Sequence, residues 1–467
     1  MSSSRRTFIK HLPFLYSLPG TLAAAPKSGL LEQRLLASFE RLEIADTHEH
    51  FFDERDRISQ HLDFFTLAQG YTTSDLVSAG LSAESSRLIR NEQAPEMERW
   101  QAFEKYWKYT RYTGYGQALR LAVHDLYGGK DVSASTVHEI NEAIRARNKP
   151  GIYRYILRKR ARIRFCVEDD SCGGCIKIGS TKENFELFVL ARRFDKFIVP
   201  ATLSDMKQLE SATGVSITSL ENLKQAAERS FEQNLAEGMS VVKIGLAYMR
   251  DLLFQEVEKA DAERDFEALM RAERPAPQGF RTAFVRPFRR LEDYMFHHVM
   301  RLADAHHVPV QIHTGLFAGN GNVITNSKPT HLINTFLLYP RIQFDLFHLG
   351  IPYQEELGIL AKSFPNVYAD FCWAYVVSPE VSRRALAEFL ESVPVNKILG
   401  FGGDYKYPEL SYAHAKMARR ALAQVMAVKV ENGLCNEQEA FEIGRLVLYQ
   451  NAARLFAWRE GKAPLQK

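Results

Sequence analysis

The sequence predicts an α/β fold of the (β/α)8 TIM-barrel type. Eight short apolar runs are bounded by turn signals, longer helical stretches separate them, and several runs end in residues suited to catalysis. The 467 residues exceed the about 250 that such a barrel needs, so the barrel must carry insertions. Residues 26–467 are interpreted as one domain, because a hydrophobic content of 46% and a charged content of 25% are ordinary for a soluble globular chain.

The eight strands are expected where short apolar runs stand between turn residues. Their ranges are 42–46, 163–167, 197–200, 240–244, 308–313, 342–348, 367–371 and 398–402.

Two insertions and a helical C-terminus are predicted around this barrel. Residues 53–160 form a mostly helical insertion after the first strand. Residues 250–290, with Pro275 and Pro277, should form a helix and then a loop over the active site. Helices over 412–431 and 437–456 close the barrel. The apolar stripe of the first insertion is expected to be core rather than a cofactor site; it contains Trp100, Phe103, Trp107, Tyr115 and Leu119.

The N-terminus is predicted to be a targeting segment rather than part of the fold. Arg5 and Arg6 precede a modestly apolar stretch and three alanines, the layout of a twin-arginine signal peptide over residues 1–25. A disordered basic tail is the alternative. The signal predicts a periplasmic or exported protein, and this route often carries proteins already loaded with a cofactor.

Charge argues for a small-molecule substrate rather than a nucleic acid or a membrane. The formal net charge is +4, and removal of Arg5, Arg6 and Lys10 with the signal leaves +1. No later apolar stretch is long enough to insert stably into a membrane. Cys172 and Cys175 form a C-x-x-C pair whose state stays open between a local disulfide, a redox pair and free thiols.

His48-Glu49-His50 is the most informative motif. Residues i and i+2 of a strand point to the same face, so the two imidazoles can hold one metal ion. Glu49 points away from them and is not expected to be a ligand. A surface pair of histidines without a ligand is the alternative for this motif alone.

Other predicted strands end in comparable residues, and strand ends meet at the catalytic face of such a barrel. Strand four ends in Lys243, strand five in His313, strand six in His348, and strand eight leads to Asp404. Convergence of this many reactive groups by chance is improbable, which favours a catalytic site.

These motifs resemble the amidohydrolase superfamily of metal-dependent barrels. The segments around Lys243, His313 and Asp404 are similar to the amidohydrolase-related domain that precedes glutamine synthetase-like domains, and the helical insertion is similar to uronate isomerase. Uronate isomerase lacks the strand-six histidine that His348 supplies. The resemblance implies a homo-oligomer and a metal site, with His48, His50, His313, His348 and Asp404 as ligands and Lys243 as a carboxylated bridge between two ions.

The ligand types suit one or two divalent ions, with zinc expected and manganese or iron possible. Such a metal makes a hydroxide nucleophile near neutral pH. Asp404 is expected to move its proton, and His348 or His313 to polarise a carbonyl if not fully used as a ligand. Lys243 either bridges two metals, binds a substrate carboxylate, or is a salt-bridged structural residue.

The substrate-binding residues are expected beyond strands four and five. Tyr248 and Arg250 follow strand four, and Arg250 could clamp a carboxylate with two hydrogen bonds. His331 follows strand five. For each of these side chains a solvated surface position is the alternative.

Three functions remain open from the sequence. The first is hydrolysis of a C–N or C–O bond of an amide, lactone or ester. The second is uronate isomerisation or decarboxylation in the same barrel. The third is a binding protein with a decayed site, which the complete set of ligands disfavours.

Overall fold

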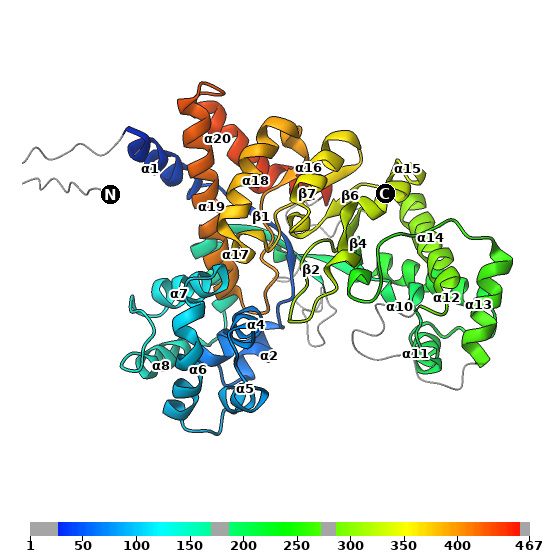
Figure 1. Cartoon of the computed structure of the whole chain (residues 1–467), viewed down its shortest axis with the longest axis horizontal. Coiled ribbons are helices and arrows are strands. Elements are labelled where there is room, and N and C mark those ends of the chain that lie inside the picture. Colours follow the sequence, from blue (N-terminus) through cyan, green and yellow to red (C-terminus); the bar gives the residue numbers. More distant parts are fainter. Residues whose placement is uncertain (1–26, 170–185, 272–285, 458–467) are drawn as a thin grey trace, which may run out of the picture.

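The computed structural model describes residues 27–169, 186–271 and 286–457. Within them, eight parallel strands follow one another in chain order around a single sheet, β1 to β8 (Figure 1). The strands are β1 (Ile44–Glu49), β2 (Ile163–Asp169), β3 (Phe188–Arg193), β4 (Met239–Ile244), β5 (Val310–Ile312), β6 (Phe344–Leu346), β7 (Val367–Asp370) and β8 (Ile398–Leu399).

The sheet curls until its last strand meets its first. The Thr47 N–H donates to the Phe401 carbonyl at 3.1 Å, and the Asp404 N–H donates to the His48 carbonyl at 2.8 Å. These bonds lie just beyond β8, so the barrel is nearly closed and the predicted fold class is confirmed. They also place Asp404 beside the histidines of β1.

The third strand was predicted at the wrong place. Residues 197–200 are apolar, but Asp195–Ile198 form a short helix, α10, whose Phe197 and Ile198 are buried. The strand is Phe188–Arg193, which pairs with β2 from Cys166 opposite Phe188 to Asp169 opposite Ala191. The run at 197–200 is apolar because Phe197, Ile198 and Val199 belong to the hydrophobic core, and it is shorter than an ordinary strand.

The insertion between β1 and β2 is helical, as predicted, and forms a lobe to one side of the barrel (Figure 1). Trp100, Phe103 and Trp107 are at most 2% exposed, so this aromatic stripe is core. The lobe consists of α2 (Glu54–Ser59), α3 (Phe64–Leu67), α4 (Tyr71–Ser78), α5 (Ala83–Arg90), α6 (Glu96–Thr110), α7 (Gly114–Leu126), α8 (Val137–Arg147) and the π-helix η1 (Arg154–Ala161).

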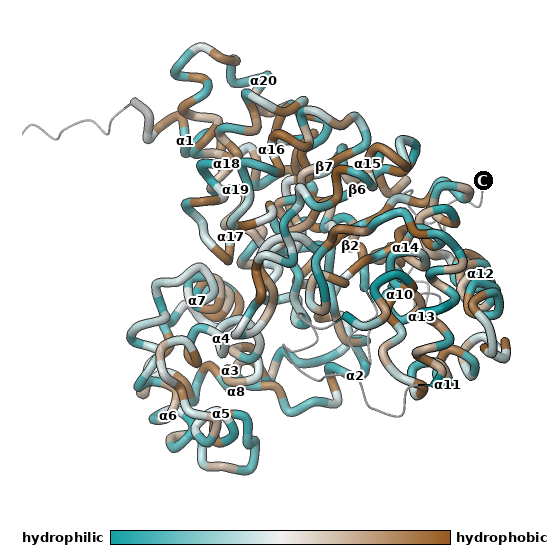
Figure 2. The backbone as a smooth tube through the Cα atoms, turned by 45° about the vertical axis from the view of Figure 1, so that its right-hand side comes forward, coloured by the Kyte–Doolittle hydropathy of each residue, from teal (hydrophilic) through white to brown (hydrophobic). Residues whose placement is uncertain are grey.

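The remaining helices surround the barrel, and hydrophobic and hydrophilic residues alternate along outer helices such as α12 and α14 (Figure 2). This alternation is typical of helices with one face on a core. The predicted C-terminal helix over 412–431 is confirmed as α19, and the one over 437–456 is divided into α20, η9 and α21. The longer elements are α1 (Lys27–Phe39), α11 (Leu203–Thr213), α12 (Leu220–Ala236), α13 (Lys259–Arg271), α14 (Arg289–Ala305), α16 (Gln354–Ser363), α18 (Pro379–Ser392), α19 (Pro408–Glu431) and α20 (Glu437–Arg445). The shorter ones are η3 (Leu246–Tyr248), η5 (Ile324–Ser327), η6 (Pro329–Leu332), α15 (Ile333–Leu338), η7 (His348–Gly350), α17 (Ala374–Val377), η8 (Val395–Lys397), η9 (Leu446–Gln450) and α21 (Asn451–Leu455).

Three predicted features lie outside the described residues: the signal segment 1–25, the Cys172–Cys175 pair and the loop with Pro275 and Pro277. In the described part of the chain, no helix combines the length and the apolar character needed to span a bilayer.

Candidate metal centre

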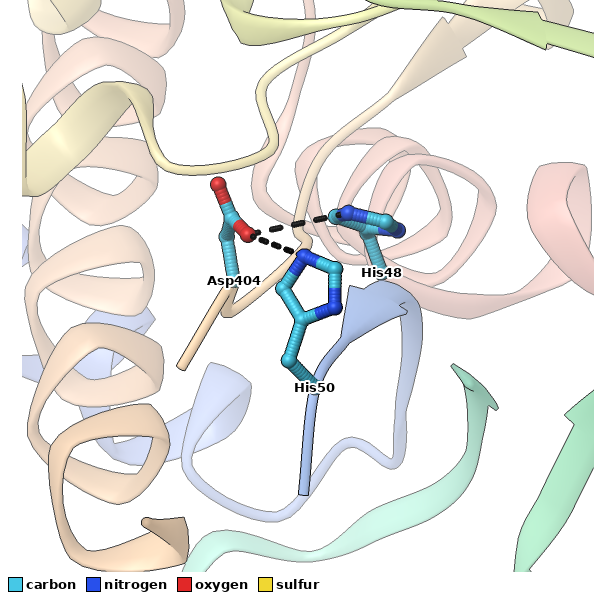
Figure 3. A group of neighbouring side chains, drawn as sticks. All are labelled: His48, His50 and Asp404. Carbon is cyan, nitrogen blue, oxygen red and sulfur yellow. Dashed lines mark ion pairs between the residues drawn. The ribbon is translucent and has the colours of Figure 1, made fainter. Parts of the chain in front are cut away.

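Three side chains from the two ends of the barrel sheet converge on one point. His48 and His50 project from the end of β1, and Asp404 follows β8 (Figure 3). The Oδ1 atom of Asp404 lies 3.3 Å from His50 Nε2 and 3.6 Å from His48 Nε2. His48 is 2% and Asp404 7% exposed, so these groups are largely withdrawn from water.

The hydrogen bonds of His50 show which of its nitrogens faces Asp404 with a lone pair. His50 Nδ1 lies 3.0 Å from the Asp169 carbonyl oxygen, which can only accept, so Nδ1 carries the proton. Because Nδ1 donates to this carbonyl, it is the Nε2 atom of His50 that faces the Asp404 carboxylate. Two acceptors at this distance repel each other unless a proton or a cation lies between them.

The same reasoning applies to His313 after β5 and His348 after β6. His348 Nδ1 faces the Cys372 carbonyl at 3.2 Å, and His313 Nε2 faces the Leu316 carbonyl at 2.9 Å. Both of these nitrogens must donate. The other two, His313 Nδ1 and His348 Nε2, then point lone pairs at each other across 3.1 Å.

The pKa shifts agree with neutral imidazoles. Burial, and then the neighbouring Lys243 and histidine charges, hold the pKa of His48 well below its usual value; for His313 the causes are burial, His348 and Lys243. Burial is also the main cause that lowers the pKa of His348 to about 4. Burial alone would raise the pKa of Asp404, but the hydrogen bond with His50 and the nearby imidazoles of His48 and His348 hold it well below its usual value.

The donor set fits a divalent transition metal. Bonds of about 2.0–2.1 Å in a tetrahedral site place neighbouring ligand atoms about 3.3–3.4 Å apart. The separations of 3.3 and 3.6 Å between Asp404 and the β1 histidines are close to this. Neutral imidazoles with one carboxylate suit zinc, manganese or iron.

The Asp404 carboxylate faces two groups of ligands. Its Oδ1 faces the β1 histidines, while its Oδ2 lies 4.0 Å from His348 Nε2. A second possible ligand group consists of His348, Cys372 and Asp404, whose donor atoms lie within 4.8 Å of one another. The donor atoms around Asp404 therefore form two groups, one with the β1 histidines and one with His348 and Cys372.

Backbone contacts hold Asp404 in place. Its φ of 63° lies in the left-handed region, which costs energy for a residue other than glycine. The neighbouring amides are fixed by carboxylates from β1: Gly403 N–H donates to Asp46 at 2.9 Å, and Tyr405 N–H donates to Glu49 at 2.7 Å. Tyr71 of the insertion donates its hydroxyl proton to the Asp404 carbonyl at 2.7 Å. Glu49 therefore positions Asp404 and points away from its flanking histidines, as expected.

Two polar residues near the histidines escaped the sequence reasoning. Asp169 ends β2 with its Oδ2 4.0 Å from His48 Nε2, and Arg193 ends β3 and binds Asp169 at 2.7 Å. The rule that strand ends carry the site would have found Asp169, had the second strand been extended two residues beyond 167. Arg193 was missed because the third strand was misplaced.

Cys372 was also missed. It lies two residues beyond β7 and is 0% exposed, and His348 lies at the same distance beyond β6. Cysteine after a strand was the available signal, but a lone cysteine is more often a small core residue.

Lys243 lies at the site without an ion-pair partner among the described residues. Its Nζ atom is buried, makes no hydrogen bond there, and stands 3.4 Å from the centre of the Phe347 ring. Burial and the Arg193 charge lower its pKa to about 8. The salt-bridged structural role considered for Lys243 does not match this environment.

The three predicted substrate-binding residues lie in different environments. Tyr248 is 43% exposed, packs against the His313 ring with 4.8 Å between centroids, and accepts a hydrogen bond from Ala318 N–H. It lies at the site. His331 lies on η6. Burial lowers the pKa of its imidazole, and the charges of Asp251, Lys328 and Glu356 also affect this pKa.

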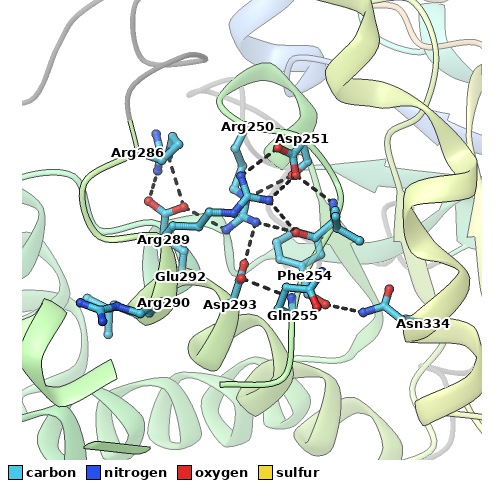
Figure 4. Close-up of polar contacts among 12 residues, drawn as sticks. Arg250, Asp251, Phe254, Gln255, Arg286, Arg289, Arg290, Glu292, Asp293 and Asn334 are labelled. Atoms are coloured by element: carbon cyan, nitrogen blue, oxygen red, sulfur yellow. Dashed lines mark hydrogen bonds and ion pairs between the residues drawn. The ribbon is translucent and has the colours of Figure 1, made fainter. Parts of the chain in front are cut away.

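Arg250 is a correction (Figure 4). Its guanidinium is 0% exposed and binds Glu292 at 2.9 Å and Asp293 at 2.6 Å, both on α14. It also donates to the carbonyls of Asp251 and Leu253. The predicted carboxylate clamp is wrong because all of the guanidinium nitrogens already have partners inside the protein.

Comparisons with known proteins match this fold. A family model described as amidohydrolase matches residues 255–458. Protein fluG of Emericella nidulans is 32% identical over 176 residues, which are 36% of this chain and only 20% of fluG. A uronate isomerase of Nostoc punctiforme is 21% identical over 437 residues, covering 85% of this chain and 87% of that enzyme.

Solved structures agree in fold. A uronate isomerase from Thermotoga maritima has a TM-score of 0.74 at 17% identity, over 91% of this chain and 97% of that one. A putative metal-dependent hydrolase from Lactobacillus casei has a TM-score of 0.66 at 19% identity, with the same coverage of both chains. At these identities the likeness concerns the fold alone.

Proposed function

We propose that this chain, which is similar to amidohydrolases and to uronate isomerases, is a metal-dependent hydrolase of a small polar substrate. The bond attacked is a C–N or C–O bond of an amide, lactone or ester. The observation that carries the proposal is the pair of facing lone pairs on His313 and His348, 3.1 Å apart. The pair provides ligand atoms after β5 and β6, in addition to those of the β1 histidines and Asp404.

When bound, a divalent ion, proposed to be zinc, supplies Lewis acidity that makes water a better nucleophile and polarises a carbonyl oxygen. His48, His50 and one oxygen of Asp404 would hold it. His313, His348 and the other Asp404 oxygen would hold a second ion, with Cys372 beside them.

Asp404 is proposed to move the proton. Its carboxylate is ionised, and its backbone is fixed by the Asp46 and Glu49 carboxylates, so its oxygens keep one orientation during the reaction. It can accept a proton from the attacking water and deliver it to the leaving group.

His313 and His348 are proposed as ligands and not as hydrogen-bond donors to the substrate. Each uses its ring proton on a backbone carbonyl, of Leu316 and Cys372 respectively. Neither ring therefore has an N–H left to donate to a substrate carbonyl, as the sequence had suggested. Lys243 and the Tyr248 hydroxyl are the groups proposed to contact the substrate, and a carboxylated Lys243 bridging two ions is the alternative for that residue.

Uronate isomerisation or decarboxylation is the second candidate function. The alignment with the Nostoc punctiforme uronate isomerase favours it, since an alignment over 85% of this chain is too long to leave out the whole of the helical insertion that packs beside Asp404. In that case the metal would bind substrate oxygens and Asp404 would still transfer a proton.

One experiment separates these functions. Purified protein is analysed for metal content and then assayed on N-acyl amides, γ-glutamyl amides, lactones and uronates, with His48→Ala as the inactive control. Hydrolysis of an amide or lactone with no turnover of uronates supports the hydrolase. Turnover of uronates alone overturns it, and a full metal complement in His48→Ala refutes the site.

A further inference from the structure

A pocket separate from the metal centre lies on the flank of the molecule, between the helical insertion and α19. Its volume is about 550 Å³, within the range of small-molecule sites. It is lined by His124, Asp125, Leu126, Gly128, Gly129, Arg147, Arg160, Tyr412 and Lys416. None of these residues belongs to the metal centre.

Two arginines in this pocket share one neutral partner. Arg147 and Arg160 both donate to the Tyr155 hydroxyl oxygen, at 3.3 and 3.1 Å. Arg160 also donates to the Asp125 carbonyl and the Tyr412 hydroxyl, each at 3.2 Å. Neither guanidinium forms an ion pair with a carboxylate in the part of the chain that the structure describes.

The shared phenol brings two positive charges close together. Like charges that share one hydrogen-bond acceptor repel each other, and the neutral Tyr155 side chain offers its oxygen and its ring face but no formal negative charge. The two arginines lower the pKa of the Tyr155 phenol, as expected where positive charge lacks a counter-ion.

The pocket's carboxylate is already engaged. Asp125 accepts from Lys416 at 2.6 Å and from the Tyr412 hydroxyl at 2.8 Å, and it contacts His124 Nδ1 at 2.9 Å. It therefore neutralises Lys416 and holds it at the pocket. The positive charges of Arg147 and Arg160 are therefore not balanced by this carboxylate.

We propose that this pocket binds a small dianion, a phosphate group or a dicarboxylate, between the Arg147 and Arg160 guanidiniums. The rigid fork of an arginine matches the oxygens of either group. The anion would replace the repulsion between the two arginines with charge-assisted hydrogen bonds. Because Arg147 ends α8, Arg160 lies on η1 and Lys416 lies on α19, a bound anion would join the insertion to the helix that follows Asp404.

The test is calorimetric titration of the metal-loaded protein with inorganic phosphate and, separately, with malonate, at constant ionic strength. Arg147→Gln and Arg160→Gln should each weaken binding by about tenfold or more, since a hydrogen bond to a charged group is lost. Arg145→Gln is the matched control, because it removes the same charge from α8 at a residue paired with Glu142. It should change the affinity less than twofold.

Asp125→Asn should change the affinity for the anion in the opposite direction. It removes the carboxylate from the pocket and keeps an amide of the same shape, so phosphate should bind more tightly. Stronger binding of phosphate than malonate identifies a phosphate site, and the reverse identifies a dicarboxylate site. Binding that survives both arginine substitutions lies elsewhere, for example at the metal, and overturns the proposal. Equal weakening in Arg145→Gln, or no measurable binding of either anion, also overturns it.

Discussion

His313 Nδ1 lies 3.1 Å from His348 Nε2, and the other nitrogen of each ring donates to a backbone carbonyl. The two facing nitrogens both carry lone pairs, an arrangement that is stable only around a cation or an added proton. The relationship is therefore the strongest local sign of a metal in this barrel.

Chelation should destabilise the wild type more than a variant that lacks one of these rings. Metal at 100 times its dissociation constant adds about 3 kcal/mol to the free energy of unfolding. We expect denaturant unfolding of the wild type to show a loss of this size after chelator treatment, and His313→Ala to show a smaller one. An equal loss in both proteins would mean that His313 is not a ligand.

Cobalt substitution should reveal sulfur at the metal. Burial raises the pKa of Cys372 well above its usual value, so only a bound cation would favour its thiolate. The cobalt-substituted protein should show a sulfur-to-cobalt charge-transfer absorption, and Cys372→Ser should abolish it. Cys435→Ser, a less buried cysteine outside the site, is the control. A band that persists in Cys372→Ser would exclude this sulfur.

Lys243→Met should raise the stability of the chelator-treated protein while abolishing activity. Burial lowers the Lys243 pKa from 10.5 to about 8, so the folded state binds this proton more weakly than the unfolded state. At pH 7 both states are protonated and the full cost of about 3 kcal/mol is present; it disappears as the pH rises from 8 towards 10.5. Urea unfolding at pH 7 measures the gain. A loss of stability instead would show that Lys243 makes a stabilising contact in the metal-free protein and would contradict this account.

Arg250→Met should act on stability and leave the metal content unchanged. Removing the guanidinium leaves the buried Asp293 carboxylate without its ion pair, while Glu292 keeps its contact with Arg286, and we expect a cost of about 3–5 kcal/mol. Arg290→Met, whose side chain is 50% exposed and paired with Asp265, is the matched control and should cost about 1 kcal/mol or less. Unchanged unfolding of Arg250→Met would restore the possibility of a substrate role.

Stability at acid pH should depend on Lys416. Burial raises the pKa of Asp125, but hydrogen bonds from Lys416, His124 and Tyr412 outweigh it and lower the pKa to about 2, from 3.8. A depressed carboxyl pKa stabilises the folded state above 3.8, and this contribution is lost as the pH falls towards 2. Lys416→Met should therefore be less stable than the wild type near neutral pH by about 1–2 kcal/mol, after allowance for solvent screening. The difference should shrink on acidification, and a difference independent of pH would contradict this account.

Much of the barrel was predictable because a strand is specified locally. Apolar runs bounded by turn residues located seven of the eight strands, and their ends pointed to His48, His50, His313, His348 and Asp404. The third strand failed because Phe188–Arg193 ends in two arginines, while the more apolar run beside it packs as α10. Local hydrophobicity reports burial, and burial alone does not distinguish a strand from a short buried helix.

The roles of individual side chains needed the tertiary structure. Arg250 has the same sequence context whether it binds a substrate or Glu292 and Asp293, because its partners lie about forty residues away along the chain. Asp169, Arg193 and Cys372 joined the site only when neighbouring strands placed them beside the histidines.

The sequence by itself determined the fold class and the set of residues at the strand ends, since both follow from short-range patterns of apolar and polar residues. Only the tertiary structure decided which imidazole nitrogens carry lone pairs, that Glu49 holds Asp404, and that Lys243 has no counter-ion among the described residues. Those properties depend on carbonyls and charges contributed by distant segments, and the distances between such groups are set by how the barrel closes.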